Sequence, residues 1–178
     1  MAWQITTWEF SVDMWVNVKD LNSNIWYLRD TDFKGLFFYG MNPYFRLGID
    51  NNNRLALWQK VWGAWKGTTS REVLPTNKWI HLVATHNKTT LEDSLYIDGV
   101  KVNNYSTSSN GSYEVYVSSL YWNAFGGRKY NSTRPNTNFF NGKLDEVRLY
   151  NKSLTQEQIS NLYQHGTCLL YTSPSPRD

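Results

Sequence analysis

The clearest pattern in the chain is a strict alternation of apolar and polar side chains from Trp8 to Val18. Every second residue from Trp8 onward is apolar, and apart from Trp15 the residues between them are polar. A period of two is typical of a β-strand, in which successive side chains point to opposite faces. The segment therefore predicts a strand with one buried face and one polar face.

Short runs of the same kind recur along the chain and are separated by residues that favour turns. Asp98-Gly99 predicts a type I′ hairpin, because both residues tolerate the positive φ angles of that turn. Many short strands with turn-sized gaps are typical of an antiparallel β-sandwich. The further predicted strands are Ile25–Leu28, Leu36–Tyr39, Tyr44–Ile49, Leu55–Trp58, Trp79–Thr85, Ser94–Ile97, Val100–Val102, Tyr113–Val117, Ser119–Phe125 and Lys143–Tyr150.

One helix is predicted near the C-terminus. Thr155 and Gln158 form a capping box, in which each side chain accepts a hydrogen bond from the other residue's backbone amide. Leu154 and Ile159 are placed to form the accompanying hydrophobic staple, and Gly166 is a suitable C′ residue. We expect a short helix that ends at Gly166 and covers one end of the sandwich.

Composition excludes several classes of protein. The 178 residues are enough for one domain. Aromatic residues make up 16% of the chain, with 9 Trp, and this content argues against disorder. No apolar stretch approaches the roughly 18 residues of a membrane-spanning helix, and the residues after Met1 lack a signal-peptide pattern. The net charge of +3 is scattered along the chain, so no nucleic-acid partner is expected.

The last residues differ in character from the rest. Residues 168–178 resemble a translated transposase-type sequencing adapter; the alternative is a natural Pro/Ser-rich tail. We therefore expect one domain over residues 1–166, followed by an artefactual or disordered tail over 167–178, as in a metagenomic gene fragment. The single cysteine, Cys168, lies in this tail, which excludes an internal disulfide and a cysteine-based zinc site.

Three segments resemble the laminin-G-like jelly-roll domain, a family of the concanavalin A-like lectin/glucanase superfamily. They are Phe10–Val16, then Trp79–Ala84 leading to Leu95–Gly99, and finally Phe140–Tyr150 with its trailing helix. The resemblance implies an all-β fold, an antiparallel β-sandwich of jelly-roll, concanavalin A-like type with one short C-terminal helix. It also implies an earlier strand. We expect that strand to be reduced or missing, the latter if Met1 is internal to a longer gene.

The superfamily includes glycosidases, which need two carboxyl groups about 5–5.5 Å apart for a retaining mechanism. Asp145 and Glu146 are adjacent and are expected on opposite faces of a strand. Glu9 and Asp13 share a face, but four strand residues span about 13 Å. His81 is expected to be a hydrogen-bonded core or edge histidine rather than a base. We therefore expect no enzyme activity, and a carboxylate pair from separate strands is the remaining route to catalysis.

Relatives commonly hold one structural calcium ion at the edge of the sandwich, and the resemblance implies Asp145 as its ligand. Calcium takes six to eight oxygen ligands, so one carboxylate must be joined by backbone carbonyls and a second acid. The alternative is that Asp145 caps a turn or pairs with an arginine.

Sugar binding is the remaining chemical interpretation, because aromatic rings stack on pyranose faces while polar neighbours bind the hydroxyl groups. The segment Trp58–Gly67 is interrupted by glycine, so we expect no regular strand there and some exposed rings. A second patch lies beside the loop Tyr130–Asn138. A spacer module would instead bury all three tryptophans of the first segment. The candidate ligand-binding residues are Trp58, Trp62, Trp65, Trp122, Arg128 and Tyr130.

The sequence thus predicts a non-catalytic recognition module of a larger extracellular, cell-surface or virion protein. Its expected partner is a glycan or surface polysaccharide, with neither nucleic-acid binding nor membrane insertion. One alternative is a protein-binding or adhesion module with a protein receptor, or a spacer. A second alternative is a glycan-active enzyme domain, because one fold can carry all of these functions.

Overall fold

The structure is a computed structural model, and it describes residues 9–20, 33–39, 45–61, 64–106, 124–126 and 140–172. Along these residues the elements are β1 (Phe10–Val18), β2 (Phe33–Tyr39), β3 (Phe45–Asp50), β4 (Arg54–Val61), β5 (Ala64–Val73), β6 (Trp79–Asn87), β7 (Glu92–Ile97), β8 (Val100–Lys101), β9 (Asn103–Ser106), β10 (Ala124–Phe125), β11 (Gly142–Tyr150) and α1 (Gln156–Thr172).

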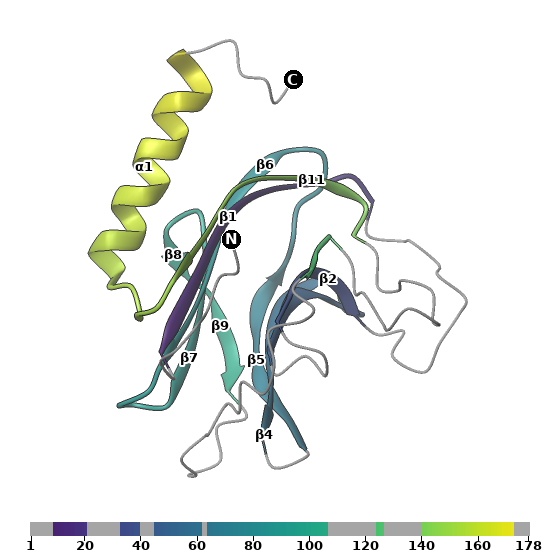
Figure 1. Cartoon of the computed structure of the whole chain (residues 1–178). Coiled ribbons are helices and arrows are strands. Elements are labelled where there is room, and N and C mark those ends of the chain that lie inside the picture. The colour runs from purple at the N-terminus through teal and green to yellow at the C-terminus, as the bar shows by residue number, and fades with distance from the viewer. Residues whose placement is uncertain are drawn as a thin grey trace.

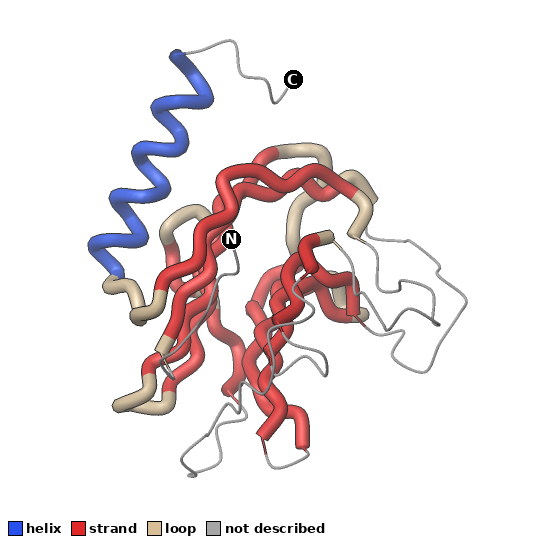
Figure 2. Tube along the Cα trace, in the orientation of Figure 1, coloured by secondary structure: helices blue, strands red, loops and turns tan. Residues whose placement is uncertain are grey.

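The strands form two antiparallel sheets packed face to face. The five-stranded sheet has the order β11-β1-β6-β7-β8, and the six-stranded sheet has the order β10-β2-β3-β4-β5-β9. Figure 1 shows α1 beside the five-stranded sheet, on the side away from the other sheet, and Figure 2 shows the two layers of strands in red with this helix in blue outside them. The predicted all-β sandwich with one C-terminal helix is confirmed.

The main core lies between the sheets and follows the period of two in the sequence. The apolar residues Phe10, Val12, Met14, Val16 and Val18 of β1 all point into it and are almost fully buried. Alternate residues of β6 lie beside them in the same sheet, and alternate residues of β3 and β4 face them from the other sheet. Burial of each such large side chain contributes about 1.5–3 kcal/mol, so this layer supplies most of the stabilisation of the fold.

The other, polar face of β1 is buried as well, so the expectation of a single buried face is wrong. Ser11, Asp13 and Trp15 are 0–2% exposed, because α1 covers this side of the five-stranded sheet. A second apolar cluster that includes Val83 and Ile159 holds the helix there. The polar residues of β1 therefore need partners within the protein.

The start of α1 confirms the predicted capping box. The Gln158 amide donates to Thr155 Oγ1 at 3.3 Å, and the Thr155 amide donates to Gln158 Oε1 at 3.1 Å. Ser11 ties this start to β1, since its hydroxyl donates to the Lys152 carbonyl at 2.8 Å and accepts from the Leu154 amide at 2.9 Å. The helix therefore begins at a point fixed both by its own cap and by the sheet.

The predicted stop at Gly166 is wrong, because α1 continues to Thr172. Gly166 instead lies against the indole of Trp15, where a Cβ atom would come within 2.5–2.7 Å of three ring atoms. The glycine thus allows close approach of helix and sheet rather than ending the helix. The last residues of α1 fall within the tail predicted over 167–178, whose origin stays a prediction.

The hairpin at Asp98-Gly99 is confirmed, with φ values of 50° and 78° at the two turn residues. The Gln156 side chain donates to the Gly99 carbonyl at 2.6 Å, which joins this turn to α1. The predicted strands Ile25–Leu28 and Tyr113–Val117 lie outside the described residues. Of the run Ser119–Phe125, the last two residues are described, and they form β10.

Two strands, β5 and β9, were not predicted as strands from the sequence, and they pair with each other in the six-stranded sheet.

Within the described ranges, no helix is long and apolar enough to cross a membrane.

Candidate functional site

Trp58 lies on the outer face of the six-stranded sheet, the face that points away from the core. In β4 the residues Leu55 and Leu57 are buried in the core, so the alternate residues Ala56 and Trp58 face outward. The register places Arg46 of β3 on one side of Trp58 and Gly67 of β5 on the other. The period of two in β4 therefore positions this indole on the outer face of the six-stranded sheet, between β3 and β5.

The ring of Trp58 is half-buried because it packs against Ala56, which is itself fully buried. On the β5 side, Gly67 has no side chain, and a Cβ atom there would meet the Leu57 carbonyl oxygen at 1.9 Å. Strands β4 and β5 are close together at this point, and the β5 neighbour adds no atoms beside the indole. Trp58 therefore packs on Ala56 and is half-buried, unlike a fully buried core tryptophan.

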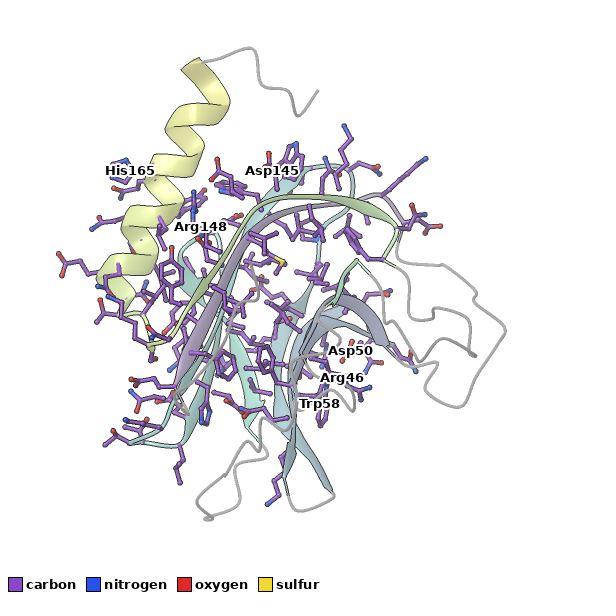
Figure 3. The ribbon with its side chains drawn as sticks, viewed as in Figure 1. Arg46, Asp50, Trp58, Asp145, Arg148 and His165 are labelled. Carbon is purple, nitrogen blue, oxygen red and sulfur yellow. The ribbon has the colours of Figure 1, made fainter. Side chains whose placement is uncertain are left out.

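Three charged side chains share the outer face of β3 and β4 with this indole. Figure 3 shows Arg46, Asp50 and Trp58 together on the side of the molecule away from α1. Asp50 Oδ1 accepts from the backbone amides of Asn52 and Arg54, each at 2.9 Å, which fixes the β3–β4 hairpin. Arg54 is half-buried at the start of β4. It lies on the same face as Ala56, two residues later, and Trp58, four residues later. We call the residues Arg46, Asp50, Arg54, Ala56, Trp58 and Gly67 the Trp58 face.

The expectation of no regular strand over Trp58–Gly67 is wrong. β4 runs to Val61 and β5 begins at Ala64, so Trp58 and Trp65 both lie within strands. Gly67 does not interrupt β5, because it occupies the position where the two strands are closest. The partial exposure of Trp58 differs from the spacer interpretation, which required all three tryptophans to be buried.

The other candidate ligand residues are not tested. Trp62 lies outside the described residues, as do Trp122, Arg128 and Tyr130, and for Trp65 the structure describes the backbone alone. The sequence analysis did not identify Arg46 and Arg54 as candidate site residues. A period-two analysis of Phe45–Asp50 and Arg54–Val61 would have found them, because each alternates with the buried residues of its strand.

A chain of charged groups lies on the opposite side of the molecule, beneath α1. His81 Nε2 donates to Asp13 Oδ1 at 2.5 Å, and Arg148 donates to Asp13 Oδ2 at 2.9 Å and to Glu146 Oε2 at 2.8 Å. Asp13 and His81 are fully buried, while the Arg148 side chain is 40% exposed. Burial alone would lower the pKa of Arg148, but Asp13 and Glu146 raise it above its ordinary value.

Two aromatic rings cover His81. The ring centroids of Trp15 and Tyr163 lie 5.2 and 5.9 Å from that of the imidazole. The expectation of a hydrogen-bonded core histidine is therefore confirmed, and these contacts keep His81 away from solvent.

The argument that Asp145 and Glu146 occupy opposite faces is wrong. The register of β1 and β11 shifts between Asp13 and Trp15, and Glu146 has a positive φ of 48°. This bulge breaks the alternation, so that Asp145 pairs with Trp15 while the Glu146 carboxylate reaches Arg148 on the same, helix-facing side.

Asp145 Oδ1 accepts from the Glu146 amide at 2.7 Å and so stabilises the bulge, as the turn-capping alternative predicted. Figure 3 shows Asp145 and Arg148 on the side of the molecule that carries α1. The described residues contain no group of three or more acidic, histidine or cysteine side chains that could hold a metal ion. They do not by themselves fit a structural calcium ion, so calcium at Asp145 stays a prediction that needs further oxygen ligands.

A second polar cluster joins the two sheets. Asp93 Oδ1 of β7 accepts from Gln59 of β4 at 2.5 Å and lies 2.8 Å from His86 Nδ1 of β6. The three residues are 0–8% exposed, and burial raises the pKa of Asp93 even though His86 and Gln59 oppose the shift. Because Gln59 follows Trp58 in β4, this cluster fixes the strand that carries the indole.

Two facing antiparallel sheets, with a C-terminal helix over one outer face, form a β-sandwich consistent with a jelly roll of the concanavalin A-like type. The chain belongs to this laminin-G-like family: the sequence profile described as the concanavalin A-like lectin/glucanases superfamily matches residues 3–160. A search of curated protein sequences finds no match.

Solved structures show the same fold. A candidate carbohydrate-binding protein from Bacteroides ovatus matches 85% of this chain with a TM-score of 0.60 and 18% identity. Domain 4 of an extracellular arabinanase from Geobacillus stearothermophilus, solved with arabinotriose, matches 88% with a TM-score of 0.58 and 22% identity. A Trypanosoma rangeli sialidase matches 95% with a TM-score of 0.60 and 16% identity.

The chain spans only part of these proteins. It covers 40% of the Bacteroides protein, 66% of the arabinanase domain and 24% of the sialidase. At such identities the comparison establishes the fold alone, and the site must be argued from the residues of this chain.

Proposed function

We propose that this domain is a non-catalytic recognition module that binds carbohydrate on the Trp58 face. The observation that carries the proposal is the indole of Trp58, which lies half-buried on the outer face of the six-stranded sheet, packs against Ala56 and has Arg46 as its cross-strand neighbour. An indole held in this way can stack on the apolar face of a pyranose, while arginine and carboxylate groups hydrogen-bond to the ring hydroxyls. The carbohydrate-binding neighbours of the same fold support the proposal.

The described carboxylates favour binding over hydrolysis. Asp50, the described acid of the Trp58 face, uses Oδ1 for two backbone amides of the β3–β4 hairpin. Asp13 and Glu146 share Arg148 beneath the helix, and Asp93 is buried between the sheets. A glycosidase instead needs two carboxyl groups that flank one sugar linkage, one of them able to give up its proton.

The setting that we propose is a larger extracellular, cell-surface or virion protein, in which this domain directs the whole chain to a glycan or surface polysaccharide. The arabinanase domain is part of an extracellular enzyme and was solved with a bound oligosaccharide.

The test is a glycan array probed with the whole chain, first with calcium and then with the chelator EDTA. Binding in both conditions is the expected result for recognition by an aromatic platform. If EDTA abolishes binding, an Asp145→Asn variant shows whether the metal acts at the β11 bulge. A blank array from a protein with a cooperative unfolding transition would contradict the proposal and favour a protein-binding or spacer module.

A further inference from the structure

We propose that the part of α1 from Tyr163 onward is a lid, which opens while the strands stay folded and uncovers the charged network around Asp13 and His81. The first turns of the helix stay docked and act as its anchor. The inference concerns the five-stranded sheet and does not depend on sugar binding at the Trp58 face. It follows from where the anchoring contacts of α1 lie and from two buried polar atoms that the closed helix leaves without partners.

The anchoring contacts of α1 lie at its start. Leu154 and Ile159 are buried in the second apolar cluster, against the five-stranded sheet. The Gln156 side chain donates to the Gly99 carbonyl at 2.6 Å, and Ser11 binds the residues just before the helix. The first turns of α1 are therefore held both by apolar burial and by hydrogen bonds to the strands.

The lid is held in a different way. Gln164 and His165 are exposed and Tyr163 is half-buried, so that Gly166, which has no side chain, is the one fully buried residue among 163–166. The Tyr163 ring stacks on Trp15 with a centroid distance of 6.0 Å. Glycine also lowers the intrinsic stability of a helix at its position. The lid thus buries little apolar side chain of its own beyond this ring contact.

Two buried polar atoms beneath the lid have no hydrogen-bond partner in the described part of the chain, the indole Nε1 of Trp15 and Nδ1 of His81. The two residues are direct cross-strand partners in β1 and β6, and they are 2% and 0% exposed. The backbone of α1 approaches the indole beside Nε1, where a Cβ atom on Gly166 would come within 2.5 Å. Both nitrogens lose water when the lid is closed and gain nothing in return, which costs free energy.

The charged network lies next to these atoms. Asp13 is fully buried and accepts from His81 and from Arg148, whose side chain is 40% exposed, so the network reaches solvent at the margin of the covered area. Opening of the lid returns the two unpaired nitrogens to water while the strand pairs and the main core stay intact. An opening that breaks so few contacts is expected at a much lower free energy than global unfolding. The open form presents an indole, an imidazole and a carboxylate that the closed form hides.

The test is native-state hydrogen exchange of the whole chain, followed by NMR. The reporters are the Trp15 indole N–H, the backbone amides of residues 163–166, and the slowest amides of β1 and β6. We expect the indole N–H and the lid amides to share one opening free energy and to exchange at least tenfold faster than the strand amides, after correction for intrinsic rates. Low urea concentrations should accelerate the lid reporters less than the strand amides, because lid opening exposes less surface.

Variants show whether the unpaired indole N–H favours opening. Replacement of Trp15 by 3-benzothienylalanine exchanges the N–H for sulfur and keeps the shape of the ring. It should raise the protection of the lid amides fivefold or more, because the closed form no longer buries an unsatisfied donor. The same replacement at Trp58, in the other sheet, is the matched control and should leave the lid amides unchanged. Gly166→Ala should lower their protection, because its methyl group meets the indole.

Each result has a defined meaning. If the Trp15 indole N–H exchanges only through global unfolding, the lid is overturned even where the lid amides exchange quickly, because that pattern is ordinary fraying of a helix end. Unchanged or reduced protection of the lid amides with benzothienylalanine at position 15, or an equal gain with benzothienylalanine at position 58, overturns it as well. These outcomes leave carbohydrate binding untouched, since the Trp58 face belongs to the other sheet.

Discussion

His81 Nε2 lies 2.5 Å from Asp13 Oδ1, and neither side chain has any exposed surface. The pair joins neighbouring strands of the five-stranded sheet beneath α1, and Arg148 adds a second donor to the same carboxylate. Removal of one member of such a buried group is strongly destabilising, because it leaves the others buried and unpaired, even where the intact group contributes little net stability.

Asp13→Ala should therefore be among the most destabilising single changes in this domain. It leaves His81 and Arg148 without their shared acceptor, and we expect a loss of about 3–5 kcal/mol in the free energy of unfolding, measured by urea denaturation. The matched control is Glu92→Gln, which breaks the exposed pair with Lys101 and should cost under about 1 kcal/mol. Equal losses of unfolding free energy in the two variants would show that the buried network is no more sensitive to the loss of a partner than the exposed pair.

The adjacent acids Glu92 and Asp93 should respond to pH in opposite directions. Burial raises the pKa of Asp93, so its contribution to stability is present below its ordinary pKa of 3.8 and is lost as pH rises through the raised value. Asp93→Asn cannot ionise, so its stability relative to the wild type should improve from pH 4 to pH 7. The improvement should be roughly 1.4 kcal/mol for each pH unit that separates the unfolded and folded pKa values.

Glu92 provides the internal comparison for that experiment. The hydrogen bond from Lys101 lowers the pKa of Glu92, so its contribution is present above the ordinary value of 4.5 and is lost as pH falls. Glu92→Gln should accordingly become less stable relative to the wild type as pH rises from 3 to 6, by a small amount because the pair is exposed. If the unfolding free energies of both variants, each taken relative to the wild type, changed with pH in the same direction, this account would be contradicted.

Gly166→Ala distinguishes a glycine at a helix end from one that allows close packing. In an ordinary helix position this change would stabilise by about 1 kcal/mol, because alanine has the higher helix propensity. Here the added methyl would meet the buried indole of Trp15, and we expect a loss of about 1–3 kcal/mol instead. Asn161→Ala, at an exposed position of α1, should be neutral or mildly stabilising. Thermal unfolding measures both.

Ser11→Ala tests the junction between α1 and the sheet. The Ser11 hydroxyl both donates to Lys152 and accepts from Leu154, and the latter amide is buried. Its removal should cost about 1–3 kcal/mol through the unsatisfied amide, and it should raise hydrogen exchange at the first turn of α1 before that of β6. Uniform exchange across helix and sheet would contradict the proposed local role.

Much of the fold was predictable because its signals are local. The period of two in β1 and the positive-φ turn at Asp98-Gly99 are properties of neighbouring residues, as is the Thr155–Gln158 cap. The burial of Ser11 and Asp13 was not predictable in this way, because it depends on where α1 lies across the sheet.

The site was harder to predict for the same reason. Trp58 was identified from composition, but its neighbour Arg46 required the register of β3 and β4. The bulge at Glu146 likewise moved a carboxylate to the face that strict alternation excludes. The network of Asp13 and His81 depends on pairing between strands about 70 residues apart in sequence, which no short pattern encodes.

The most direct test of the central claim is one glycan array probed with three proteins: the wild type, Trp58→Ala and Val100→Ser. Val100 is 64% exposed on β8 of the other sheet, so the last variant controls for general loss of apolar surface. The account predicts that wild type and Val100→Ser bind the same sugars, and that Trp58→Ala loses at least tenfold in signal while it still unfolds cooperatively. Binding by Trp58→Ala at the wild-type level would show that this face is not the carbohydrate site.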